Sequence, residues 1–360
     1  MQLLRFERID SDVLLRAIGI SMVVYHHVVL YHGYDSHKAL FGFSLVGGMG
    51  MLLMLSGFSF ARFGLHNRDR ANAMAATLST AKSIILPCYV AMVFFSIVAF
   101  TFNPAELLMI GNFIDGDWQA GFNTWYPQFL LQVFLIILVI YGLRPVGDWL
   151  ARHPALGALS LLAVALAVHV GLKTWAAPAF TGQHLPWMLI WNFFLGWAIF
   201  NLVSRDSVVP QKRLIASLVS FAAIALTLEI TETRAWTTTV AAIMVIWIPR
   251  LRLPKILSRV AFVLSQAALT IFILHMSLIK IFKFAFGRLD SILLLEAVAV
   301  VILLGGLWVL GSACVRAYYQ VKHEYQARGL VWTGLRALPG QISWRARMAT
   351  IGLRPIGGQA

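Results

Sequence analysis

Residues 12–31 read DVLLRAIGISMVVYHHVVLY, and this stretch decides the fold. A helix that crosses a bilayer needs about 20 predominantly apolar residues, and the stretch meets that length. It nevertheless carries Arg16, His26 and His27. A charged side chain at the centre of a membrane helix costs about 2.5–3.5 kcal/mol on insertion scales, so such residues mark candidate functional sites. The sequence therefore predicts a membrane span that contains a site.

Helical phase separates the three ionisable residues of this span. Arg16 and His27 lie eleven residues apart, which at about 100° per residue is roughly three turns plus 20°. Both side chains therefore leave one face of the helix, about 16 Å apart along its axis, whereas His26 points about 100° away. Taken singly, a snorkelling arginine and a histidine bonded to a neighbouring helix are the alternatives. The pair on one stripe favours a built site.

The composition is that of a polytopic membrane protein. Of the 360 residues, 59% are hydrophobic and only 12% are charged, with a mean hydropathy of +0.78. A soluble domain carries about 25% charged residues. The net charge of +14 would suggest nucleic acid in a soluble protein, but its distribution between the spans excludes that partner here. Cys88 and Cys314 fall in apolar stretches and form no disulfide framework. We expect no metal site.

The N-terminus does not resemble a cleavable signal peptide. It mixes Arg5 and Arg8 with Glu7, Asp10 and Asp12, and no A-x-A cleavage site follows the apolar run. We therefore expect the first span to remain in the mature protein.

The sequence predicts an all-α bundle of ten transmembrane helices. Its apolar runs fall near residues 13–32, 40–61, 83–102, 124–143, 155–172, 187–203, 214–231, 236–249, 261–285 and 291–315. Positive charge sets the orientation of such spans. With the N-terminus inside, 22 of the 29 Lys and Arg residues lie in inner segments and four in outer segments. Both termini are therefore predicted to be cytoplasmic, in a multi-pass membrane protein.

Two further segments complete the predicted organisation. Residues 1–315 form the membrane domain, and residues 316–360 form a basic cytoplasmic tail. Because the tail also carries Trp332 and Trp344, we expect it to lie on the anionic lipid surface. The outer loop 103–123 contains three acidic residues and an apolar LLMI core. This loop either lies along the membrane, covers a cavity or is a plain connector.

Four later stretches contain polar or small residues at membrane depth. They are 47–60 (GGMGMLLMLSGFSF), 124–134 (TWYPQFLLQVF), 191–197 (WNFFLGW) and 265–278 (SQAALTIFILHMSL). Small residues let membrane helices approach closely, and Ser or Gln side chains bond across the contact. Taken singly, each stretch is best interpreted as helix packing or an interhelical hydrogen bond.

Taken in order, the stretches resemble the acyltransferase 3 family of membrane-bound acyltransferases, from about Arg8 to Leu278. The family's Arg, ten residues and His correspond to Arg16 and His27, and its Ser-Gly-Phe stretch to GGMGMLLMLSGF. Its I-L-P-x-Y stretch corresponds to residues 85–89 (ILPCY). Its Trp-led stretch at the fourth span resembles Trp125, Gln132 and Phe134, and its late Ser-to-His signature resembles SQAALTIFILHMSL with Phe272 and His275.

Three departures concern individual residues of the family pattern. The aspartate of the second motif is absent, with Gly50 and Met51 in that region. The cytoplasmic Arg-x-x-Arg pair is not reproduced; residues 68–70 read Arg-Asp-Arg, and Lys82 follows alone. The fourth-span motif has apolar residues 130–131 where a carboxylate is usual. These departures weaken the assignment of the donor site.

The resemblance implies transfer of an acyl group, most commonly acetyl, from acyl-CoA to a hydroxyl of a glycan or lipid-linked saccharide, with no tightly bound cofactor. His27 and Arg16 would be the catalytic residues: His27 would act as general base or carry the acyl group, and the donor arm would pass Arg16. Acceptor or orienting roles fall to His275, Ser56, Trp125 and Gln132. Arg62, Arg68, Arg70 and Lys82 would meet the donor phosphates, although a solvated positive loop is the alternative for those four.

Two other classes of function remain open at this point. A transporter of a glycan or small solute would use Arg16, His27, His275 and Glu296 as a polar pathway. Transporters often contain internal repeats, and none is evident in this sequence. A purely structural membrane scaffold is the third class.

Overall fold

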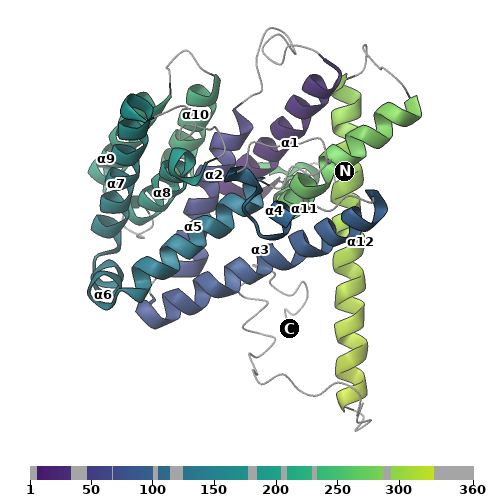
Figure 1. Ribbon diagram of the computed structural model, residues 1–360, viewed down its shortest axis with the longest axis horizontal. Coiled ribbons are helices and arrows are strands. Elements are labelled where there is room, and N and C mark those ends of the chain that lie inside the picture. The colour runs from purple at the N-terminus through teal and green to yellow at the C-terminus, as the bar shows by residue number, and fades with distance from the viewer. Residues whose placement is uncertain are drawn as a thin grey trace. The chain divides into compact units, whose positions relative to one another are not determined.

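The computed structural model describes residues 6–33, 47–66, 68–99, 104–113, 125–176, 185–203, 209–228, 233–286 and 293–327 (Figure 1). The helices and strands in chain order are β1 (Phe6–Asp10), α1 (Ser11–Tyr31), α2 (Gly48–Phe60), the π-helical turn η2 (Ala61–Leu65), α3 (Arg70–Ala99), α4 (Pro104–Leu107), the 3₁₀ turn η3 (Gly111–Phe113), α5 (Trp125–Gly142), α6 (Arg144–Arg152), α7 (Pro154–Trp175), α8 (Pro186–Val203), α9 (Pro210–Thr227), α10 (Thr233–Trp247), β2 (Arg250–Pro254), α11 (Lys255–Phe286) and α12 (Leu293–Ala327).

The helical bundle predicted from the sequence is confirmed, and each predicted apolar run overlaps a helix in the described part of the chain. In the described part of the chain, eight helices are long and apolar enough to cross a membrane. They are α1, α3, α5, α7, α8, α11 and α12, together with α2 extended through η2. The runs at α9 and α10 yield shorter or less apolar helices, so a count of ten crossings remains a prediction.

Helix α3 begins well before its apolar run, which starts near residue 83. The helix starts at Arg70, where the Asp69 carboxylate accepts a hydrogen bond from the backbone N–H of Asn72 at 2.8 Å. Such a side-chain bond satisfies one of the unpaired N–H groups at a helix start. The apolar run marks the most hydrophobic part of this helix, whereas the cap and the alanine-rich first turns set its beginning.

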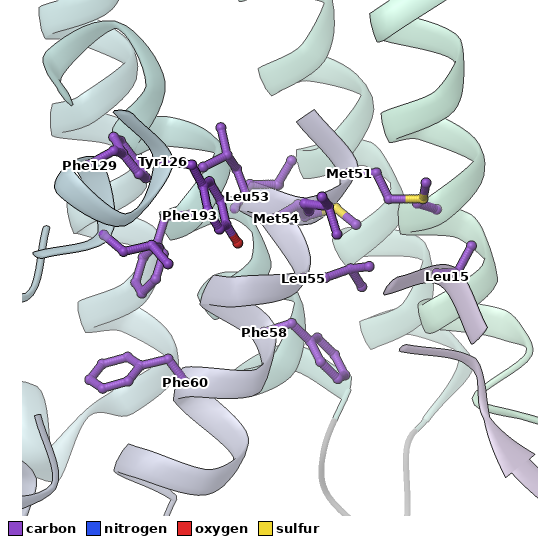
Figure 2. Packing of buried hydrophobic residues seen from close by; sticks show 14 of the residues in the cluster. Leu15, Met51, Leu53, Met54, Leu55, Phe58, Phe60, Tyr126, Phe129 and Phe193 are labelled. Atoms are coloured by element: carbon purple, nitrogen blue, oxygen red, sulfur yellow. The ribbon is translucent and has the colours of Figure 1, made fainter. Parts of the chain in front are cut away.

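The core of the bundle lies around α2. Figure 2 shows Met51, Met54, Phe58 and other apolar side chains leaving α2 on several sides, and its inner residues are almost completely buried. Backbone meets backbone where α2 crosses α8, because a Cβ on Gly57 would collide with the carbonyl oxygen of Phe193. Small residues permit this approach. The packing role predicted for the stretches 47–60 and 191–197 is thereby confirmed.

A short antiparallel ribbon, which the sequence analysis did not predict, joins β1 to β2. Its register places Phe6 opposite Pro254 and Asp10 opposite Arg250. The ribbon brings the start of α1 and the start of α11 to the same end of the bundle. The backbone N–H of Ser11 also donates to the carbonyl of Pro249 at 3.0 Å. The end of α10 therefore lies at this place too.

The chain divides into two compact units, residues 1–308 and residues 309–360. All the site residues discussed below belong to the first unit. Helix α12 continues to Ala327, past the predicted domain boundary at residue 315. Trp332 and Trp344 of the predicted tail lie outside the described residues, as do Asp115 and Asp117 of the outer loop.

Candidate functional site

The two ionisable residues on the stripe of α1 both face α11. The Arg16 guanidinium donates to the Ser265 hydroxyl at 3.1 Å, and His27 meets His275 eleven residues further along α1. Because the contacts advance in the same direction along both helices, α1 and α11 run parallel. Arg16 and His27 therefore lie on one face of α1, as their spacing predicted, and this face packs against α11.

The Arg16 side chain is held from three sides. In addition to Ser265, its guanidinium donates to the hydroxyl of Ser59 on α2 and to the carboxylate of Asp12 at 3.5 Å. One fifth of the side chain is exposed. Arg16 is therefore packed and paired within the bundle, and it is not a snorkelling arginine.

The imidazoles of His27 and His275 are in contact. Nε2 of His275 lies 3.1 Å from Nδ1 of His27, and the ring centroids are 4.8 Å apart. His275 is completely buried, whereas His27 is half-buried. Two protonated rings at this distance would place like charges together in a medium of low dielectric constant. At least one ring of the pair is therefore neutral.

The backbone assigns the protons of this pair. Nδ1 of His275 lies 2.8 Å from the carbonyl oxygen of Phe272 and 3.1 Å from that of Ile271, so Nδ1 carries the proton that it donates. Its Nε2 is then an acceptor, and Nδ1 of His27 is the donor facing it. That same Nδ1 lies 2.9 Å from the carbonyl of Val23. In the neutral pair, the basic lone pair of His27 is consequently on Nε2.

The remaining residues with predicted acceptor roles divide into two groups. Ser56 on α2 bonds the Tyr126 hydroxyl at 2.7 Å, and the Tyr126 ring lies 4.8 Å from that of Phe272. Trp125 contacts Phe272 edge to face, with the centroids 6.0 Å apart. Phe272 in turn lies 5.7 Å from His275. Ser56 and Trp125 are therefore joined to the histidine pair through Tyr126 and Phe272.

Gln132 has a different position, beside the outer-loop segment 104–113. It exchanges two amide hydrogen bonds with Asn112, at 2.8 and 2.9 Å, and its Nε2 donates to the carbonyl of Met109 at 3.0 Å. Met109 has a positive φ of 57°, which is uncommon for a residue with a side chain. Its side chain is buried against Cys88, Met92 and Ile273. The segment is thus docked on the bundle, and Gln132 holds it there.

The four residues predicted to meet donor phosphates are not gathered in one place. Arg62 pairs with Asp10 at 2.7 Å and with Asp12 at 3.3 Å. Arg68 donates to the carbonyl of Phe63, and Arg70 pairs with Asp148 at 3.2 Å. Lys82 is exposed three turns along α3 from Arg70. Among these four residues, Arg62 is the one connected to Arg16, through Asp12.

A pocket of about 170 Å³ opens beside Arg62, at the end of the bundle where α1 starts. Its wall is formed by the end of β1 and the start of α1, by the end of α2 with η2, by the end of α8, and by the end of α10 with the residues that follow it. The lining residues include Asp10, Asp12, Phe58, Arg62, Phe200 and Arg250. Arg250 pairs through its Nε with Asp10 at 3.5 Å. The pocket therefore combines two arginines, two aspartates that pair with them, and two phenylalanines.

The sequence analysis missed Asp12 and Tyr126 as site residues. Asp12 lies four positions before Arg16, which is the spacing at which side chains on a helix meet, so local spacing alone could have identified it. For Tyr126, no local signal predicts the contact with Ser56, which is 70 positions away in the chain. Glu296 is not on the Arg16–His27 stripe: it pairs with buried His32 at 2.9 Å.

The fold and the site together define a polytopic membrane protein in which parallel helices present a stripe of Arg and paired His. A model of the acyltransferase 3 family, described as an acyltransferase domain, matches residues 8–315. The chain therefore belongs to this family of membrane acyltransferases, as the resemblance of its motifs predicted. Comparison with curated proteins and with solved structures finds no significant match.

Proposed function

We propose that this membrane acyltransferase moves an acyl group, acetyl in the first instance, from acyl-CoA to a hydroxyl of a glycan such as an exopolysaccharide, an O-antigen or a lipid-linked saccharide, in a bacterial inner membrane. The observation that carries the proposal is the contact between His27 and His275, together with the family to which the chain belongs. The proposed transfer needs a base beside the acceptor hydroxyl, and His is the commonest such base.

The geometry supports the following reaction. Nε2 of His27 takes the proton of the acceptor hydroxyl as the oxygen attacks the acyl carbon of the thioester. The carbon–sulfur bond then breaks, and the imidazolium returns its proton to the departing thiolate. The products are an ester and the free thiol of CoA, and His27 is again neutral. The hydrogen bond from Nδ1 of His27 to His275 keeps the lone pair of His27 on Nε2 throughout the approach.

Arg16 acts at a different point of the donor. Its axial separation from His27 is about 16 Å, so its guanidinium does not reach the reacting carbon when that carbon is beside His27. At this distance from His27, the Arg16 guanidinium contacts the extended arm of the donor instead of its acyl carbon. Arg62 and Arg250, which line the neighbouring pocket beside Asp10 and Asp12, would meet the phosphates. Arg68, Arg70 and Lys82 are not among the residues that line this pocket. The donor thus enters at the end of the bundle where α1 starts.

The chemical class of the acceptor is inferred from the residues around the histidine pair. Trp125, Tyr126 and Phe272 form an aromatic group whose member Phe272 lies next to His275. Aromatic side chains offer large contact area together with a polar tip in tyrosine and tryptophan. These residues support an acceptor that is a ring with hydroxyl groups, and Ser56 is bonded to the same Tyr126.

Replacement of His27 by Ala tests the proposal. The variant should lose acyl transfer by at least ~10²-fold, because general-base catalysis contributes about 10²–10⁴-fold. Purified protein or membranes would be supplied with acetyl-CoA and a glycan acceptor, and ester formation and CoA release would both be measured. The matched control is His153→Ala, since His153 lies at the start of α7 away from the pair. An active His27→Ala variant would contradict the mechanism.

The same assay distinguishes the enzyme from a transporter. Acyl transfer predicts CoA release in proportion to the ester formed. Movement of a glycan across vesicles without CoA release would instead support transport along the Arg and His residues. Deletion of the gene, followed by NMR of the surface glycans, would then show which ester groups depend on this protein.

A further inference from the structure

The N-terminal end of α1 contains a chain of alternating charges. Asp12 contacts Arg16 through Oδ2 at 3.5 Å and Arg62 through Oδ1 at 3.3 Å. Asp10 contacts Arg62 at 2.7 Å and Arg250 at 3.5 Å. The order is therefore Arg16, Asp12, Arg62, Asp10, Arg250. Asp12 is the member that links the arginine on the stripe to those at the pocket.

Asp12 is placed to act on the orientation of Arg16. Its side chain is only 4% exposed, and a buried carboxylate remains ionised only when it is paired or hydrogen-bonded. It lies in the first turn of a helix, where the helix dipole favours a negative charge. Each of its two oxygens holds a different guanidinium. These two ion pairs fix the Asp12 carboxylate, which in turn fixes the direction in which Arg16 presents its N–H groups.

From this geometry we infer that Asp12 is the positioning residue of Arg16 and sets the affinity for the acyl donor. This inference rests on the proposed acyl-CoA donor. We assign Asp12 a positioning role, in which its carboxylate aims the guanidinium and Ser59 and Ser265 complete the support. A misdirected guanidinium loses its charge-assisted hydrogen bond with the donor.

The experiment compares the kinetic constants of purified Asp12→Asn and wild-type protein with acetyl-CoA and a glycan acceptor. Asn keeps the size of the side chain and removes its charge. We expect the KM for acetyl-CoA to rise about tenfold, which corresponds to ~1.4 kcal/mol, while the KM for the acceptor stays the same. The matched control is Glu7→Gln. Glu7 lies on the same N-terminal segment as Asp12, and its exposed carboxylate is 3.9 Å from Lys255 of α11. Its constants should equal those of the wild type.

Two further variants separate positioning from a structural role. Asp12→Glu keeps the charge on a longer side chain, so the donor KM should rise measurably but less than in Asp12→Asn. In an Arg16→Gln background, Asp12→Asn should raise the donor KM no further, because the group through which Asp12 acts is absent. If Asp12→Asn does not accumulate as folded protein, Asp12→Glu decides: its lengthened side chain shifts the guanidinium, and the donor KM should still rise measurably.

A donor KM that is unchanged in Asp12→Asn, or in Asp12→Glu where only that variant folds, overturns the inference. Equal effects of Asp12→Asn with and without Arg16 also overturn it. A variant with fewer folded molecules but unaltered KM values shows a structural role alone and is counted against the inference. These results leave the proposed function intact, whereas a wild-type protein that uses no acyl-CoA contradicts the proposed function itself.

Discussion

At the scale of single residues, the decisive feature is the hydrogen-bond direction within the histidine pair. The N–H at Nδ1 of His275 donates hydrogen bonds to backbone carbonyls of α11. Its Nε2 therefore accepts a hydrogen bond from His27. His275 is thereby a group that orients another group. From the sequence, His275 was predicted to orient either the acceptor or the other histidine.

Replacement of His275 by Ala should lower kcat about tenfold to a hundredfold, which is less than the loss expected for His27→Ala. The base remains in this variant, but neither its ring direction nor its tautomer is held. The KM values for donor and acceptor should change little, because His275 is completely buried. Steady-state kinetics of the purified variant provide the measurement. A rate equal to that of the wild type would show that Val23 alone orients His27.

At the scale of elements, the crossing of α2 and α8 holds the support for Arg16 in place. A Cβ on Gly196 would meet the backbone of Met54 and Phe58, and a Cβ on Gly57 would meet that of Phe193. Ser59, which supports Arg16, follows directly in α2. A backbone atom has little freedom to move aside. Glycine is therefore needed at these positions because the two helices touch there, and not because of an unusual backbone conformation.

Gly196→Val should therefore destabilise the protein by about 1–3 kcal/mol, the usual cost of an overfilled contact. Thermal unfolding in detergent would show a lower midpoint, with a parallel loss of activity. The matched control is Gly306→Val in α12, where a Cβ meets nothing within 4 Å. Equal midpoints for the two variants would contradict the close approach of α2 and α8.

At the scale of the whole molecule, the helix ends that meet at the site are those expected for a chain whose successive helices cross the membrane in opposite directions. The start of α1, the end of α2, the end of α10 and the start of α11 meet through Asp10, Asp12, Arg62 and Arg250. This arrangement is the one that the predicted inward orientation of the N-terminus requires. The same end carries the pocket, which agrees with entry of a donor from the cytoplasm.

The topology itself can be tested with reporter fusions. Alkaline phosphatase, which is active only outside the cytoplasm, should be active when fused after Ala176 and inactive when fused after Val203. A fusion after Leu228 decides between ten and eight crossings, since it is active only if α9 crosses. Fluorescent protein fused after Ala360 should fluoresce. Activity with the opposite pattern would contradict the charge-based orientation.

The sequence by itself determined the helical class, the positions of the apolar helices, and the common face of Arg16 and His27. These properties are local, because composition and a 3.6-residue period act over a few turns of one chain segment. The same is true of the spacing between Asp12 and Arg16. The order of the motifs along the chain was also sufficient to indicate the family, which the match to residues 8–315 confirmed.

Only the tertiary structure decided which residues meet. His27 and His275 are 248 positions apart, and Asp10 finds Arg250 through a ribbon that no periodicity indicated. Nearness in sequence grouped Arg62 with Arg68, Arg70 and Lys82, yet the three arginines contact separate partners. Contacts between distant segments depend on how whole helices pack, and this packing is settled by many simultaneous side-chain fits rather than by any one segment.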